Sequence, residues 1–172
     1  MAATFAWAEH YGAGKTALTP TTINWFSNAT ASNEASYQTY PVTAGTNSWE
    51  RYQYGLFTTG TFNNISAGLW AHTATAFPAN AVLAGKVTST WATPSTTTMS
   101  GSTAMTTAIS IGSGQTVLFA VANDPAGATA ASRDGSATRA TQYLVSQLQP
   151  ASNASPGDTV SGIVVTLQYD EN

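Results

Sequence analysis

The fold of this chain is indicated most clearly by residues 49–57, which read Trp-Glu-Arg-Tyr-Gln-Tyr-Gly-Leu-Phe. Alternate side chains of a β-strand point to opposite faces of its sheet. The two faces of such a strand would carry Glu50, Tyr52, Tyr54 and Leu56 on one side, and Trp49, Arg51, Gln53 and Phe57 on the other. The aromatic content and the period of two predict a strand rather than a helix.

Other short runs with alternating or continuous apolar residues, bounded by turn residues, predict further strands. They cover residues 4–8, 22–27, 65–71, 82–91, 106–111, 117–121, 143–149 and 160–169. Helical periodicity is nearly absent. We therefore predict an all-β fold, a single-domain β-sandwich of either immunoglobulin-like or jelly-roll topology. The residues expected in its core are Val117, Phe119, Val121, Ile163, Val165, Leu167 and Tyr169.

Three long polar stretches, residues 27–48, 92–103 and 122–141, interrupt this pattern. Loops longer than about 12–15 residues are uncommon in compact domains. They are expected either to be solvated or to become ordered against neighbouring subunits.

The chain divides into an N-terminal strand or arm, residues 1–22, and a sandwich domain, residues 23–172. Aromatic side chains of the arm either anchor it in a partner or belong to an edge strand of the chain's own sheet. The residues predicted for an assembly interface are Phe5, Trp7, Tyr11, Tyr37 and Tyr40.

The chain is poor in charged residues and rich in small ones. The 172 residues include 30 Ala, 29 Thr and 17 Ser, but no Cys and only 8% charged residues, for a net charge of −3. An ordinary globular chain is about 25% charged. Five scattered Lys and Arg residues exclude a nucleic-acid-binding patch, which needs clustered positive charge. No apolar run is long enough for a membrane span, and no basic segment opens a signal peptide. We therefore expect no membrane partner and synthesis in a cytoplasm.

Sequence motifs for catalysis, cofactors and metals are weak. The stretch Gly12-Ala-Gly-Lys-Thr16 ends like a phosphate-binding loop, but Glu9 stands where the first Gly is required. The histidines, His10 and His72, lie in no nucleophile motif, and the eight carboxylates are scattered. The five Trp residues fall within predicted strands, where core packing explains them better than sugar stacking. We predict no catalytic, cofactor-binding or metal-ligating residues.

Two parts of the chain resemble a family of tailed-bacteriophage virion proteins. Residues 41–52, Pro-Val-Thr-Ala-Gly-Thr-Asn-Ser-Trp-Glu-Arg-Tyr, are similar to the family's Pro-Ile-Thr-Ala-Gly-x-Asn-Ser-Tyr-Glu-Lys-Trp segment. The run Tyr-Leu-Val-Ser-Gln-Leu-Gln at 143–149, and residues 154–157 and 165–171, resemble its ending. The similarity spans residues 41–171 with gaps and departs from the pattern at Trp49 and Tyr52, so no contact residues are transferred.

The resemblance implies a virion structural protein, and the composition resembles that of capsid decoration, or cement, proteins. Such a protein is non-enzymatic and lies on the capsid exterior, where it stabilises contacts between subunits of the major capsid protein. It is a homo-oligomer, with a trimer favoured by the resemblance. Low charge suits this role because it reduces repulsion between crowded copies. The alternatives are a tail or neck structural protein, or a carbohydrate-binding or adhesin module.

Overall fold

The computed structural model describes residues 4–19, 23–31, 38–59, 62–71, 80–105, 139–155 and 163–171. These residues form strands, turns and loops, and no helix occurs among them. The strands, in chain order, are β1 (Thr4–Tyr11), β2 (Thr16–Leu18), β3 (Arg51–Thr59), β4 (Phe62–Ala71), β5 (Ala81–Thr88), β6 (Thr103–Met105), β7 (Arg139–Ala140), β8 (Tyr143–Pro150) and β9 (Ile163–Glu171). The prediction of an all-β fold is confirmed for this part of the chain.

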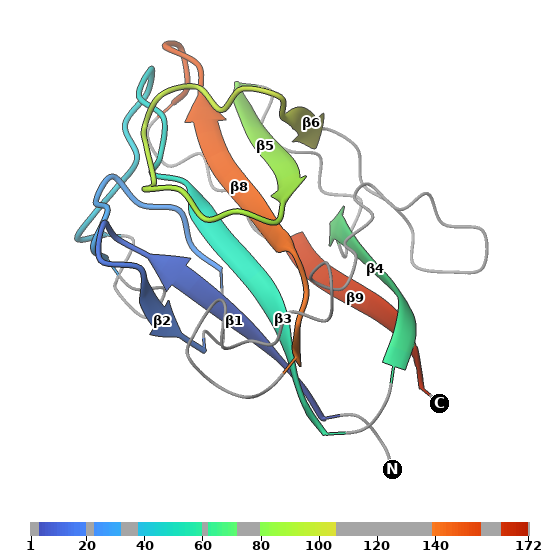
Figure 1. Cartoon of the computed structure of the whole chain (residues 1–172). Coiled ribbons are helices and arrows are strands. Elements are labelled where there is room, and N and C mark those ends of the chain that lie inside the picture. Colours follow the sequence, from blue (N-terminus) through green and yellow to red (C-terminus); the bar gives the residue numbers. More distant parts are fainter. Residues whose placement is uncertain are drawn as a thin grey trace.

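Seven of the described strands form one antiparallel sheet in the order β2-β1-β3-β8-β5-β6, with the short β7 pairing with β3 (Figure 1). Strands β4 and β9 form a separate antiparallel pair. Strands β3 and β8 lie at the centre of the main sheet, so residues from the first and last thirds of the chain meet there.

A glycine-rich turn joins β1 to β2. Gly12 has φ +67°, a conformation in which a side chain is strained, and its carbonyl accepts a hydrogen bond from the Lys15 N–H at 3.2 Å. Glu9 of β1 then pairs with Leu18 of β2. The stretch that ends like a phosphate-binding loop is therefore a hairpin turn between two strands.

Several predicted strands have shifted ends. The strand predicted at 49–57 begins at Arg51, because Trp49 and Glu50 donate their backbone N–H groups to loop carbonyls of Phe26 and Ser95. The first strand continues past Ala8 to Tyr11, where β2 extends its pairing. The strand predicted at 82–91 ends at Thr88, and Trp91 packs from the following loop.

The prediction of a strand at residues 22–27 is wrong, since the described residues 23–27 form no strand. Their backbone makes isolated hydrogen bonds in place of a ladder: the Ser27 N–H donates to Tyr40 O, and Phe26 O accepts from Trp49 N. The two neighbouring rings both turn toward the main sheet, Trp25 half-buried and Phe26 fully buried. A strand would have sent them to opposite faces.

The two faces of the main sheet are covered by different loops. One, here called the tyrosine face, carries the apolar core: Ala8, Tyr52, Tyr54, Ala84, Met99, Tyr143 and Val145, with Leu56 and Trp91 packed against it. Met99 and Trp91 come from the loop between β5 and β6, which crosses the sheet in yellow-green in Figure 1. The other, the arginine face, carries Glu9, Arg51, Gln53 and Ser146 beneath residues 23–31.

Some predictions lie outside the described residues. These are the strands at 106–111 and 117–121 with Val117, Phe119 and Val121, and most of the stretch 122–141. Strand β9 covers most of the strand predicted at 160–169, and β4 covers the one predicted at 65–71. Burial of Ile163, Val165, Leu167 and Tyr169 stays a prediction.

Candidate functional site

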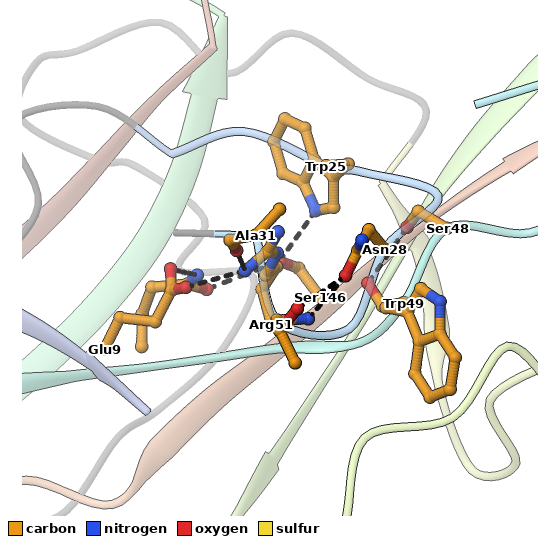
Figure 2. Close-up of polar contacts among 10 residues, drawn as sticks. Glu9, Trp25, Asn28, Ala31, Ser48, Trp49, Arg51 and Ser146 are labelled. Atoms are coloured by element: carbon orange, nitrogen blue, oxygen red, sulfur yellow. Dashed lines mark hydrogen bonds and ion pairs between the residues drawn. The ribbon is translucent and has the colours of Figure 1, made fainter. Parts of the chain in front are cut away.

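The arginine face holds a buried ionic cluster formed by β1 and β3. Glu9 and Gln53 are paired across these strands, and Arg51 lies two residues before Gln53 on the same face. The Arg51 Nη1 donates to Glu9 Oε1 at 3.0 Å (Figure 2). The Gln53 Nε2 donates to Glu9 Oε2 at 2.9 Å. The three side chains are at most 1% exposed. Both carboxylate oxygens of Glu9 are therefore occupied by donors, out of contact with solvent.

Residues 23–31 cover this cluster and are fixed by it. Arg51 Nη1 also donates to the Ala31 carbonyl at 2.8 Å, and its guanidinium carbon lies 4.8 Å from the centre of the Phe26 ring. The Trp25 indole N–H donates to Ser146 Oγ at 3.1 Å, as Figure 2 shows. A cation over an aromatic ring is attracted to the electron-rich face. Arg51 thus links two strands and the covering segment.

The electrostatics of Arg51 point to a structural role. Burial lowers the pKa of its guanidinium, and the nearby Glu9 carboxylate opposes that shift. Its Nε and Nη2 atoms have no hydrogen-bond partner among the described residues, although both are buried. Burying polar atoms without hydrogen-bond partners lowers the stability of the folded protein. The packing of the surrounding residues must therefore offset this cost and keep Arg51 in place.

The tyrosine face holds a hydrogen-bonded cluster around His10. Its Nδ1 lies 2.7 Å from the Tyr143 hydroxyl, and its Nε2 lies 3.3 Å from the Tyr54 hydroxyl. A neutral imidazole has one N–H donor and one acceptor nitrogen, and a hydroxyl can serve either. Both ring nitrogens can therefore be paired without charge. The Tyr143 ring also makes edge contacts with Tyr52 and Tyr54, each at 5.4 Å between ring centres.

Two further polar side chains fasten the loop between β5 and β6. Gln147 is fully buried, and its Nε2 lies within hydrogen-bonding distance of the carbonyls of Ser48, Ser95 and Thr97, at 3.0–3.2 Å. Its Oε1 accepts from the Met99 N–H at 3.1 Å. Glu50 Oε2 accepts from the Ser95 N–H at 3.2 Å.

Burial changes the acidity of two groups on the tyrosine face. It raises the pKa of the Glu50 carboxyl, an effect that the positive charge of Lys86 and the Ser95 N–H partly oppose. It also raises the pKa of the Tyr52 hydroxyl to about 12, with the charge of Glu50 adding to the shift. The Tyr52 hydroxyl therefore stays protonated near neutral pH.

Four of the five residues predicted for an assembly interface are described, on β1 and in the loop between β2 and β3. Phe5 and Trp7 lie half-buried on β1 with their ring centres 5.4 Å apart, where β1 pairs with β3 but not with the short β2. This part of β1 belongs to the edge of the chain's own sheet. Tyr11 ends the same strand, whereas Tyr40 makes an edge contact with Phe26. Tyr37 lies outside the described residues. Their role in assembly stays a prediction.

Sequence reasoning missed the buried clusters on both faces. Glu9 and His10 are adjacent on β1, so their side chains point to opposite faces and take part in different clusters. One sequence feature could have predicted the buried ionic cluster: Arg51, one of five Lys and Arg residues in the chain, lies between aromatic residues of a predicted strand. An arginine there needs a carboxylate partner. Glu9 lies directly after the strand predicted at residues 4–8, but its pairing with the strand of Arg51 depends on the register between strands.

Comparisons with known proteins give no independent assignment. No family model, no curated protein and no solved structure matches the chain. Within the part of the chain that the structure describes, no three His, Cys, Asp or Glu side chains gather as metal ligands. The same residues include no helix long and apolar enough to cross a bilayer.

Proposed function

We propose that this chain is a non-enzymatic capsid decoration protein of a tailed bacteriophage. It would bind the outer surface of the head and stabilise contacts between subunits of the major capsid protein. One observation carries the proposal: charged and amide side chains are turned inward to fasten long, uncharged loops over both faces of a sheet. Arg51 binds the Ala31 carbonyl and Gln147 binds the carbonyls of Ser95 and Thr97, while Glu9 and Gln53 complete the cluster that holds Arg51. All four side chains are at most 1% exposed.

The surface left by this arrangement suits repeated contact with protein neighbours. Exposed loop positions in the described segments are mostly Thr, Ser, Ala and Gly. Such groups hydrogen-bond across wet interfaces, and they avoid the cost of stripping water from full charges. The resemblance of residues 41–52, 143–149, 154–157 and 165–171 to phage virion proteins favours a head or tail component among the assemblies that use such surfaces.

The proposal includes a β-sandwich as the complete fold. The main sheet would form one layer, and the pair β4–β9 would contribute to the second. Strand β4 follows β3 directly along the chain and pairs with β9 rather than with any strand of the main sheet, which supports this assignment. Immunoglobulin-like and jelly-roll topologies both remain compatible with this strand order.

The test uses phage heads assembled from the major capsid protein of the same phage, prepared without this chain. Added protein is expected to co-sediment with the heads in a fixed ratio and to raise the temperature at which they break. Empty tail tubes and an array of glycans serve as comparison targets. Failure to bind heads contradicts the proposal, binding to tails instead supports a tail or neck protein, and binding to glycans alone supports an adhesin module.

A further inference from the structure

The loop between β5 and β6 is much longer than the pairing of its strands requires. These neighbouring antiparallel strands pair directly, with Gly85 opposite Thr103. Such hairpins usually need about 2–5 connecting residues. Here β5 ends at Thr88 and β6 begins at Thr103. The excess chain crosses over the tyrosine face (Figure 1).

The central part of this loop, residues 92–102, is here called the threonine lobe. It exposes Thr93, Thr96, Thr97, Thr98 and Ser100 to solvent. The sequence contains no charged residue between Lys86 and Asp124. The lobe therefore presents hydroxyl groups without any charge of its own.

The shape of the threonine lobe is fixed from beneath. Gln147 binds its backbone at Ser95, Thr97 and Met99, and the Asn47 Nδ2 donates to Thr96 O and Thr98 Oγ1, each at 3.1 Å. The Met99 side chain is 4% exposed and packs in the core. A loop held in one shape loses little conformational entropy when it binds a partner.

Anchoring the threonine lobe costs free energy that a short turn between β5 and β6 would not cost. Glu50 is 8% exposed and directs its carboxylate at the Ser95 N–H, and taking a carboxylate out of water is unfavourable. A long loop, an uncharged exposed surface and a costly buried anchor occur together at one place. Proteins that break the usual rules of loop length and polar burial often do so at a functional site.

We propose that the threonine lobe is a docking surface for a second copy of this chain. A strongly charged partner would lose hydration against the lobe without gaining an opposite charge. A surface of this chain avoids that loss, because only 8% of its residues are charged and two of its carboxylates, Glu9 and Glu50, are buried. The inference rests on the proposed function, since it names the contact by which a decoration protein would form its oligomer.

The test compares three full-length proteins by sedimentation velocity over a range of concentrations, without heads. The double variant Thr96→Lys, Thr97→Lys places two charges on the lobe, at side chains that make no hydrogen bond to any described residue. Thr16→Lys, at an exposed site on the edge strand β2, is the matched control. We expect an oligomer for the unmodified chain, a dissociation constant raised by about tenfold or more in the double variant, and a change within about twofold in the control. Thermal unfolding is expected to stay unchanged in both variants.

Three results would overturn the inference: a monomer at every concentration for the unmodified chain, an oligomer insensitive to the double variant, or equal weakening by Thr16→Lys. Head binding separates this outcome from the proposed function. An unmodified chain that binds heads as a monomer sustains the proposed function and overturns the self-docking lobe. An oligomer that depends on the lobe but does not bind heads supports the self-docking lobe and contradicts the proposed function.

Discussion

The two faces of the main sheet are both covered by loops, but different kinds of side chain lie buried on them. Strands β1, β3 and β8 contribute to both faces, so each strand alternates between them. On the tyrosine face, His10 lies among tyrosine rings and neutral hydroxyl groups. On the arginine face, Glu9 and Arg51 form an ion pair that is out of contact with water.

The difference teaches how each face contributes to stability. Aromatic rings gain free energy from buried area and from edge contacts, which need no charge. A buried ion pair barely repays the cost of removing two charges from water, but breaking it is expensive. The packed rings thus stabilise the tyrosine face without charge, whereas on the arginine face Arg51 fixes which segment covers the sheet.

The largest effect is expected from removing residues 1–22, which deletes β2 together with β1, a strand that serves both faces. The truncated chain loses Glu9 and His10 together, along with the pairing of β1 to β3. We expect loss of more than the about 5–15 kcal/mol that stabilises a typical domain, and hence no cooperative transition in urea. A cooperative transition in the truncated protein would show that β1 is a detachable arm, and that neither face depends on it.

Breaking the arginine face is expected to have the next largest effect. Arg51→Met leaves the Glu9 carboxylate buried without its cation and releases the Ala31 carbonyl. We expect a loss of about 3–5 kcal/mol in the free energy of unfolding, measured by urea titration. The double variant Glu9→Gln, Arg51→Met removes both charges and is expected to recover most of that loss. No recovery would mean that Arg51 acts through packing on Phe26 rather than through its charge.

The hydroxyl groups of the tyrosine face are expected to contribute less. Tyr143→Phe removes the partner that lies 2.7 Å from His10 Nδ1, at an expected cost of about 1–3 kcal/mol in thermal or urea unfolding. Tyr54→Phe removes a longer contact of 3.3 Å and is expected to cost less. A larger loss of stability in Tyr54→Phe than in Tyr143→Phe would show that the shorter hydrogen bond is not the more stabilising one.

The smallest effect concerns the pH dependence contributed by Glu50. Because its pKa is raised in the folded protein, the folded state holds this proton more tightly than the unfolded state. This contribution to stability is therefore greatest in acid and falls as the pH rises from the ordinary pKa of Glu through the raised value. Glu50→Gln is expected to lack this fall and to be the more stable protein above that range, in unfolding measured across pH. Tyr54→Phe, which keeps the carboxyl, serves as the control and should retain the fall.

Local alternation allowed much of β3 to be predicted from sequence. The assignment of Tyr52 and Tyr54 to one face and of Arg51 and Gln53 to the other is correct, because the period of two is a property of the strand itself. The partners of those faces depend on register between distant strands. No local pattern specified that Glu9 would lie opposite Gln53, or that His10 would reach Tyr143.

Segments that cover the sheet were the hardest to predict. Ile23 and Trp25 share a period of two, which predicted a strand, but hydrogen bonds from Trp25 to Ser146 and from Trp49 to the Phe26 carbonyl hold the segment as a loop. Such contacts join residues far apart in sequence, and they override local propensity.

The position of β8 beside β3 has a consequence for synthesis. Arg51 pairs with Ser146, so the centre of the sheet closes only after most of the chain has left the ribosome. Until then one edge of β3 has no strand of its own chain to pair with, and an unpaired edge can join another nascent copy. Folding dominated by such distant contacts takes roughly milliseconds to seconds. A slow final step of this kind would make the yield of native protein fall as the expression rate rises, even though the finished sheet is stable.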